Sequence, residues 1–233
     1  MIHVHSLSLD LGGRRVLEEV SLSVARGESV GLIGPNGSGK TSLLRCLLGL
    51  VPFTGRALID GFDVVRDPIA ARSRVAWLPQ KPAFGDATAR EVLAFVARLR
   101  RLDAGRISAI LADVGLGEHA EQRARTFSGG MQQRLSLALA LFVDAPVLLL
   151  DEPSASLDRE GQERFISAIG RLRSAGRTMV LASHRPEEIA LLTDRVLRVG
   201  EGAIVAVVSE AGTGGNVVRL PHRVEGRPFH EGT

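Results

Sequence analysis

The run Gly34-Pro-Asn-Gly-Ser-Gly-Lys40-Thr41 has the residue types and spacing of a loop that binds phosphates. Its glycines let consecutive backbone N–H groups wrap an anion, and a helix that starts at the end of the loop adds the positive end of its dipole. The Lys40 ammonium would reach the β and γ phosphates of a nucleotide, and the Thr41 hydroxyl would bind Mg²⁺. An apolar run precedes the loop and a helical pattern follows it, which favours phosphate binding over a surface turn.

Two adjacent carboxylates, Asp151 and Glu152, come at the end of the apolar run from Val147 to Leu150. Successive side chains of a strand point to opposite sides, so two neighbouring acids can take different tasks. Asp151 suits the ligand shell of Mg²⁺, and Glu152 suits a base that polarises a water for attack on a γ phosphate. The pair therefore predicts phosphoryl transfer to water.

A second anion site is predicted at Ser128-Gly-Gly-Met131, where a helix begins. Ser128 can cap this helix while Gly129 and Gly130 expose their backbone N–H groups. The chain thus has two phosphate-facing helix starts but one catalytic strand end, and predicted helices separate the two. We expect a head-to-tail dimer, in which Ser128 of one subunit meets the nucleotide held by Lys40 of the other.

The elements around these motifs indicate an α/β fold with a mainly parallel sheet. Turn glycines predict two antiparallel hairpins, over 2–24 and 196–208, and short apolar runs predict strands at 29–34, 75–78, 147–150 and 178–182. Apolar residues three and four apart predict helices over 40–48, 89–101, 107–114, 131–142 and 159–173. We expect one domain over 1–210, with a helical subdomain at about 85–140, and a loosely attached tail over 211–233.

The composition excludes several classes of protein. The chain is 45% hydrophobic and 24% charged, which is typical of a globular domain, and no run approaches the roughly 20 apolar residues of a spanning helix. The first residues show no secretory signal, so we expect a cytoplasmic protein. A net charge of +3 predicts no nucleic-acid partner, and the single Cys46 excludes an internal disulfide.

With these motifs in this order, the chain resembles the nucleotide-binding domain of an ABC transporter over about residues 1 to 208. The motifs that carry the resemblance are Walker A (Gly34 to Thr41), the Q-loop (Leu78-Pro-Gln80), the signature (Phe127-Ser-Gly-Gly-Met131), Walker B (Leu148 to Glu152), the D-loop (Ser156-Leu-Asp158) and the switch histidine (Ser183-His184). The resemblance implies a P-loop NTPase core, an N-terminal antiparallel β-subdomain and an α-helical signature subdomain.

The resemblance also implies a function and its partners. The chain would bind and hydrolyse ATP with Mg²⁺ as one half of a dimer, with a homodimer expected. It would lie on the cytoplasmic face of the membrane as a peripheral subunit, and ATP-driven dimerisation would drive transport by a separate integral membrane permease subunit.

The expected site residues fall into three groups. Catalytic roles go to Lys40, Gln80, Glu152 and His184, and Mg²⁺ contacts to Thr41, Gln80 and Asp151. By resemblance, Gln80 would sense the metal and couple to the membrane subunit, His184 would contact the γ phosphate, and Asp158 would touch the opposite subunit. The residues expected to contact the nucleotide are Gly34, Pro35, Asn36, Gly37, Ser38, Gly39, Lys40, Thr41, Ser42, Ser128, Gly129, Gly130 and Asp158.

Two residues depart from the family pattern. Leu11 stands where the family usually has an aromatic residue that stacks on adenine, so base stacking should be weak. Met131 replaces the usual signature glutamine and leaves the anion contacts of Ser128 and the glycine backbone in place. A chain with this signature and no predicted membrane span resembles the ATP-binding subunits of exporters more than those of importers.

Two other functions fit the sequence less well. A nucleic-acid-associated ABC ATPase would carry long heptad stretches, zinc cysteines or a second fused domain, and the sequence has none of them. A binding module with degraded catalysis is disfavoured because Lys40, Asp151, Glu152 and His184 are all intact.

Overall fold

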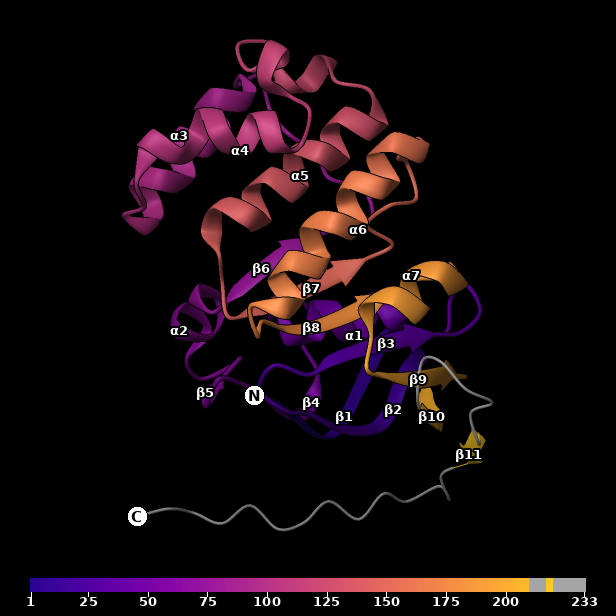
Figure 1. Ribbon diagram of the computed structural model, residues 1–233. Coiled ribbons are helices and arrows are strands. Elements are labelled where there is room, and N and C mark those ends of the chain that lie inside the picture. The colour runs from indigo at the N-terminus through magenta and orange to yellow at the C-terminus, as the bar shows by residue number, and fades with distance from the viewer. Residues whose placement is uncertain (210–216, 220–233) are drawn as a thin grey trace.

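The computed structural model describes residues 1–209 and 217–219, which fold into two sheets and the helices packed on them (Figure 1). The smaller sheet is antiparallel, with strand order β2-β1-β4-β5. Its strands are β1 (Ile2–Leu11), β2 (Arg14–Val24), β4 (Thr54–Ile59) and β5 (Phe62–Asp63). Gly12 and Gly13 form the turn between β1 and β2 with positive φ angles of 57° and 76°, which glycine adopts without a steric penalty. The predicted N-terminal hairpin is confirmed.

The larger sheet has seven strands in the order β11-β10-β9-β3-β8-β7-β6. These are β3 (Ser29–Ile33), β6 (Val75–Leu78), β7 (Val147–Asp151), β8 (Thr178–Ala182), β9 (Arg195–Gly200), β10 (Ala203–Ser209) and β11 (Val217–Arg219). The five strands from β9 to β6 run parallel, and β10 pairs antiparallel with both β9 and β11. The mainly parallel sheet and the second hairpin are therefore as predicted. Of the expected tail over 211–233, only β11 lies within the described residues.

The helices are α1 (Lys40–Leu47), α2 (Pro68–Ser73), α3 (Ala89–Arg100), α4 (Ile107–Asp113), α5 (Gly129–Val143), α6 (Arg159–Ser174) and α7 (Pro186–Leu192), with short 3-10 turns at Ala104–Arg106, Gly117–His119 and Ala124–Thr126. All five predicted helices are present. Thr88 and Glu91 form a capping box that starts α3. Within the described residues, no helix is both long and apolar enough to cross a lipid bilayer.

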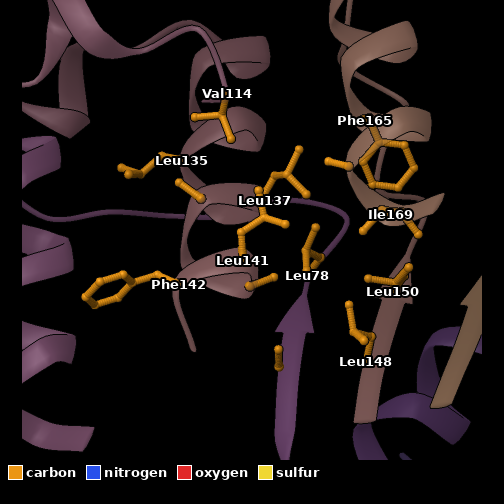
Figure 2. Packing of buried hydrophobic residues seen from close by; sticks show 14 of the residues in the cluster. Leu78, Val114, Leu135, Leu137, Leu141, Phe142, Leu148, Leu150, Phe165 and Ile169 are labelled. Carbon is orange, nitrogen blue, oxygen red and sulfur yellow. The ribbon is translucent and has the colours of Figure 1, made fainter. Parts of the chain in front are cut away.

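Strand β7 separates two hydrophobic cores because its side chains alternate between the two faces of the large sheet. Val147 and Leu149 face α1 and the antiparallel sheet. Leu148 and Leu150 face the helices on the other side, where Ile169 and Phe165 of α6 lie over Leu150 (Figure 2). Both cores hold the carboxyl end of β7 rigidly, and that end carries the paired acids.

The arrangement in Figure 1 is layered, with α1 between the two sheets and helices α5, α6 and α7 on the far face of the large sheet. Helices α3 and α4 pack beside α5 at one side of this outer layer. Residues 85–143 contain helices and no named strand, so the signature motif stands at the start of a helix within this helical region.

Candidate active site

Four neighbouring parallel strands end at one edge of the large sheet, and a predicted motif follows each of them. In sheet order, β3 leads into the Walker A loop, β8 into Ser183 and His184, β7 into Glu152, and β6 into Gln80. The strands end at matching levels, since Leu32 and Asp151 both pair with Ala182. The crevice outside the carboxyl ends of such strands is where α/β sheets bind ligands. The topology therefore brings motifs from four separate stretches of the chain together.

The Walker A loop curls around the Lys40 ammonium. Its Nζ donates hydrogen bonds to the carbonyl oxygens of Gly34 at 2.8 Å and Pro35 at 3.1 Å, and the side chain is buried. A Cβ added at Gly34 would lie 2.2 Å from the Val199 carbonyl oxygen, so only glycine fits there. Gly39 has φ 105° and would clash with Leu17, which again requires glycine. The loop conformation depends on these two glycines.

Two observations mark the loop as an anion site. The N-cap of α1 is Gly39, so no side chain accepts from the first N–H groups of this helix. The Ser38 hydroxyl oxygen is buried and has no hydrogen-bond partner, which is uncommon for a buried polar atom. A phosphate group in the loop would supply the acceptors that these donors lack. The Walker A residues therefore fit a nucleotide phosphate.

Asp151 and Thr41 meet across the site. The Thr41 hydroxyl donates to Asp151 Oδ1 at 3.0 Å, which joins the start of α1 to the end of β7. Burial raises the pKa of the Asp151 carboxyl, while the Thr41 hydrogen bond and the charges of Arg45 and Lys40 act in the opposite direction. A hydroxyl and a carboxylate oxygen side by side are the hard oxygen donors that Mg²⁺ prefers. The two residues therefore fit the metal.

Glu152 and His184 form a direct pair. His184 Nδ1 lies 2.6 Å from Glu152 Oε2, and the His184 backbone N–H donates to the same oxygen at 3.3 Å. The Glu152 carboxylate is buried, whereas the His184 ring is largely exposed. Strand alternation does not separate the two acids as predicted, because β7 ends at Asp151 and Glu152 has a left-handed φ of 46°. This left-handed residue, not the pleat, sets the direction of the carboxylate.

The Q-loop residue stands apart from the other predicted site residues. Gln80 follows β6 at the same sheet edge, but its side chain is exposed, and no hydrogen bond joins it to another site residue in the described part of the chain. Its neighbour Pro79 accepts a 3.4 Å hydrogen bond from the amide of Gln133, a buried residue of α5. The loop is therefore tied to the signature helix through Gln133, which the sequence patterns did not single out.

The signature and the D-loop lie against each other in one chain. Ser128 caps α5 by accepting from the Met131 N–H at 3.2 Å, and Gly130 approaches the Ser156 carbonyl so closely that a Cβ would lie 3.1 Å from it. Asp158 caps α6 through the Gly161 N–H and accepts from Arg134 of α5 at 2.9 Å. The Gly161 N–H bond first, and Arg134 second, lower the pKa of the exposed Asp158 carboxyl.

These signature residues do not complete the Walker A site of their own chain. Among residues 1–209 and 217–219, no hydrogen bond or ion pair connects Ser128, Gly129 or Gly130 to the loop from Gly34 to Thr41. In the described residues the signature thus has no hydrogen bond or ion pair to its own Walker A loop, and the composite site of a head-to-tail dimer stays a prediction.

Leu11 and Val16 are the two aliphatic residues relevant to the prediction of weak base stacking. Leu11 lies at the end of β1 opposite Arg14 and is 43% exposed. Val16 of β2 is half-buried, and its carbonyl oxygen would lie 3.1 Å from a Cβ on Gly39. Val16 is therefore a second apolar residue beside the loop, one that the family pattern did not indicate.

A buried carboxylate behind the pair was also missed by sequence reasoning. Glu188 of α7 is 2% exposed and accepts hydrogen bonds from the hydroxyls of Ser154 and Ser183. In the sequence it reads as an ordinary acidic residue in the first turn of a helix, because nothing in Pro186-Glu-Glu188 signals which glutamate is buried.

Comparison with known proteins agrees with this site. A family model described as ABC transporter matches residues 17–155, more than half of the chain. The linearmycin resistance ATP-binding protein of Bacillus subtilis (strain 168) is 30% identical over 213 residues, which are 89% of this chain and 68% of that protein. The phosphate import ATP-binding protein PstB 2 of Natronomonas pharaonis is 34% identical over 247 residues, covering 98% and 86%. A solved ATP-binding subunit of an ABC transporter has a TM-score of 0.84 at 26% identity, covering 90% of each chain.

The family model, the two relatives and the solved subunit are all ABC transporter proteins or their ATP-binding subunits. In this chain the Walker A, Walker B, Q-loop and switch-histidine motifs follow four neighbouring strands at one edge of the large sheet. Subunits of this family dimerise and work with transmembrane partners. The chain belongs to the ABC transporter family and is its ATP-binding subunit, an ATPase that drives transport through a separate membrane subunit.

Proposed function

We propose that the chain hydrolyses ATP in a head-to-tail dimer with two composite sites. Each site combines the Walker A loop, Asp151, Glu152 and His184 of one subunit with the signature and Asp158 of the other. The observation that carries this proposal is that Ser128 packs beside its own D-loop and makes no hydrogen bond to its own Walker A loop. The backbone N–H groups of Gly129 and Gly130 at this helix start can bind an anion, and in a head-to-tail dimer the nucleotide held by the opposite subunit would supply it.

Within each composite site, different residues bind the phosphates, accept the proton of the attacking water and hold the metal ion. The Lys40 ammonium and the backbone N–H groups from Gly37 to Ser42 neutralise the phosphates, and phosphoryl transfer gains most from this kind of positioning. The buried Glu152 carboxylate accepts a proton from the attacking water, and His184 holds that carboxylate in place. Thr41 and Asp151 would hold Mg²⁺, which neutralises charge on the phosphate oxygens when bound.

Mixing two inactive variants tests the composite arrangement. A Lys40→Ala subunit and a Ser128→Arg subunit form heterodimers in which one site carries both lesions and the other carries neither. We expect the mixture to recover part of the ATPase activity that each homodimer lacks. A self-contained site in each chain predicts no recovery at any mixing ratio.

A disulfide gives a physical test that does not depend on activity. We expect Ser38→Cys with Ser128→Cys, in a chain whose Cys46 is replaced by Ser, to form a covalent dimer when ATP is present. Each single-cysteine variant serves as the control and should stay at monomer size on a non-reducing gel. A disulfide confined to one chain would contradict the head-to-tail dimer.

We also propose where the membrane subunit docks. A groove of about 340 Å³ lies between the large sheet and α3, lined by Leu48, Leu50, Trp77, Val96 and Leu99, with Arg72 and Arg100 among its other lining residues. Leu50 and Leu99, two of these lining residues, are more than half exposed. Trp77 precedes Gln80 by three residues on the same segment, so a segment in the groove would contact the strand that leads to the Q-loop. An amphipathic cytoplasmic segment of the membrane subunit, apolar with acidic ends, fits these side chains.

The docking proposal is tested by co-purification of the membrane subunit with the tagged chain. We expect Leu50→Asp and Leu99→Asp to lose the membrane subunit and to keep ATPase activity. Leu191→Asp on α7, where Leu191 is 55% exposed away from the groove, is the matched control and should keep the partner. Equal recovery of the membrane subunit with all three variants would overturn the assignment of the groove.

The direction of transport stays a prediction. The relatives include a resistance protein and a phosphate import protein, so the ATPase fold described here serves transporters of different kinds. We propose export on the resemblance of the signature alone. Uptake or release of a labelled substrate by vesicles that contain the whole transporter tests it.

A further inference from the structure

Glu188 places a buried carboxylate behind the catalytic pair. Glu188 is 2% exposed, and each of its two carboxylate oxygens accepts a hydrogen bond from a different residue. Oε1 accepts from the Ser154 hydroxyl, and Oε2 accepts from the Ser183 hydroxyl at 2.8 Å. Ser154 and Ser183 are themselves buried.

The two donors belong to the two loops that carry the catalytic pair. Ser154 comes two residues after Glu152, and Ser183 comes directly before His184. Each carboxylate oxygen of Glu188 thus holds one of these two loops. Glu152 Oε2 and His184 Nδ1, which the loops carry, lie 2.6 Å apart. One carboxylate therefore joins the loop after β7 to the loop after β8.

The link extends towards the D-loop. Arg185 lies 3.6 Å from Glu188 Oε1, and its guanidinium also donates to Gln162 of α6 at 2.8 Å. The Gln162 amide in turn donates to the Leu157 carbonyl at 2.8 Å. The carboxylate is thus connected to the D-loop of its own chain, which the composite site brings to the opposite subunit.

Stability alone does not account for a carboxylate at this position. Burial raises the pKa of the Glu188 carboxyl, while the hydrogen bond from Ser183 and the charge of Arg185 act in the opposite direction. A buried ionic group often stabilises a fold no better than a well-packed apolar residue of the same size. A buried polar network does fix one geometry, provided that each member has its partners.

We infer that Glu188 is a positioning residue that holds Glu152 and His184 in the alignment needed for hydrolysis. This inference rests on the roles proposed above for those two residues. A misplacement of about 1 Å in a catalytic group can lower a rate about 100-fold, so a hydrogen-bonded support behind the pair affects turnover directly. ATP affinity depends on the Walker A loop, which Glu188 does not contact.

The test compares Glu188→Gln with Glu187→Gln, its exposed neighbour on the same helix, as the matched control. An amide has one acceptor oxygen, so one of the two serine hydroxyls loses its acceptor. We expect kcat to fall at least about 10-fold in Glu188→Gln with KM for ATP within twofold, and no change in Glu187→Gln. Ser154→Ala, which cuts one tether and leaves the carboxylate, should give a smaller drop. The combined effect of the double variant Ser154→Ala with Glu188→Gln should differ from the product of the two single effects, because both changes act on the same pair of hydrogen bonds.

The outcomes separate the inference from its alternatives. If Glu188→Gln lowers the melting temperature but leaves kcat of the folded protein equal to that of Glu187→Gln, Glu188 is structural only and the inference is overturned. The same holds if the effects of Ser154→Ala and Glu188→Gln simply add. Glu152→Gln is measured alongside. If that variant hydrolyses ATP normally, the proposed role of Glu152 as the base fails. If Glu152→Gln is inactive and Glu188→Gln is fully active, only the positioning role of Glu188 fails.

Discussion

His184 Nδ1 lies 2.6 Å from Glu152 Oε2, so the residue after β7 and the residue that follows β8 by two positions share one hydrogen bond. The backbone of Glu152 is held as well, because its N–H donates to the Ala182 carbonyl at 2.8 Å. The carboxylate is fixed at the sheet edge by its own backbone, by the ring of His184 and by the His184 N–H. A base held in this way needs little reorganisation when a water approaches it.

Glu152→Gln should keep ATP binding and lose nearly all turnover. The amide preserves the shape and one acceptor of the side chain but cannot take a proton from water. A lost general base typically lowers the rate about 10²- to 10⁴-fold. The measurement is phosphate release in parallel with binding of a fluorescent ATP analogue.

The Glu152→Gln variant should also form a stable dimer in ATP, seen by size-exclusion chromatography, because closure is no longer followed by hydrolysis. Glu187→Gln, which makes the same change on an exposed side chain, should behave as the unmodified chain. Turnover within twofold of the unmodified chain would remove Glu152 from the role of base.

Thr41→Val should shift the metal dependence of hydrolysis. Valine has the shape of threonine but lacks the hydroxyl that lies 3.0 Å from Asp151 Oδ1. We expect the Mg²⁺ concentration for half-maximal activity to rise at least about 10-fold, while Thr41→Ser, which keeps the hydroxyl, stays near the original value. Removal of Mg²⁺ with EDTA should stop hydrolysis in the unmodified chain. An unchanged metal dependence in Thr41→Val would place the metal elsewhere.

The strands and motifs were predictable because their signals are local. An apolar run that ends in a glycine-rich loop or in paired acids identifies β3 and β7, and period-3.6 patterns identify α3 and α6. Strand β4 depends on pairing with β1, about fifty residues earlier, and its pattern is broken by Gly55 and Arg56. Helix α2 has six residues, too few to show a period. Contacts distant in sequence decide such elements.

The site shows the same division between residue type and geometry. Motif order predicts that Glu152 and His184 share a crevice, but the left-handed φ of Glu152 that aims its carboxylate follows from the structure alone. The buried state of Glu188 and Gln133 follows from what packs over them, not from their spacing. Sequence therefore predicts which residues do chemistry better than it predicts which residues hold them.

Cys46 should be unreactive in the folded chain. Burial raises the pKa of its thiol from 9.0 to about 12, so at pH 9 about half of an unfolded thiol is ionised but only about 0.1% of the folded one. A disulfide reagent such as DTNB should therefore leave the native chain unmodified between pH 7 and 9 and react fully in guanidinium chloride.

The raised pKa of the Cys46 thiol also makes the stability of the fold depend on pH. The unfolded thiol releases its proton above about pH 9 and the folded thiol does not, so this group lowers the free energy of unfolding as the pH rises between about 9 and 12. Replacement of Cys46 by Ser should flatten that part of the stability curve in urea titrations. One thiol reacting per native chain within minutes at pH 8 would show that the α1 core opens readily.

Leu11 should limit how well the site distinguishes one base from another. Its aliphatic side chain is 43% exposed at the end of β1, and Val16 beside Gly39 is also aliphatic, so neither can stack on a purine as an aromatic ring does. The phosphate contacts are the same for every nucleoside triphosphate. We expect ATP and GTP to bind with affinities within about 10-fold of each other, as measured by isothermal titration.

Leu11→Tyr should tighten ATP binding by about 1 kcal/mol, or roughly fivefold, through stacking on the base. Leu11→Met is the matched control, because it keeps an apolar side chain of similar size without a ring, and it should leave the affinity unchanged. Strong adenine preference in the unmodified chain, with no gain from tyrosine, would show that a residue other than Leu11 supplies the surface on which the base lies.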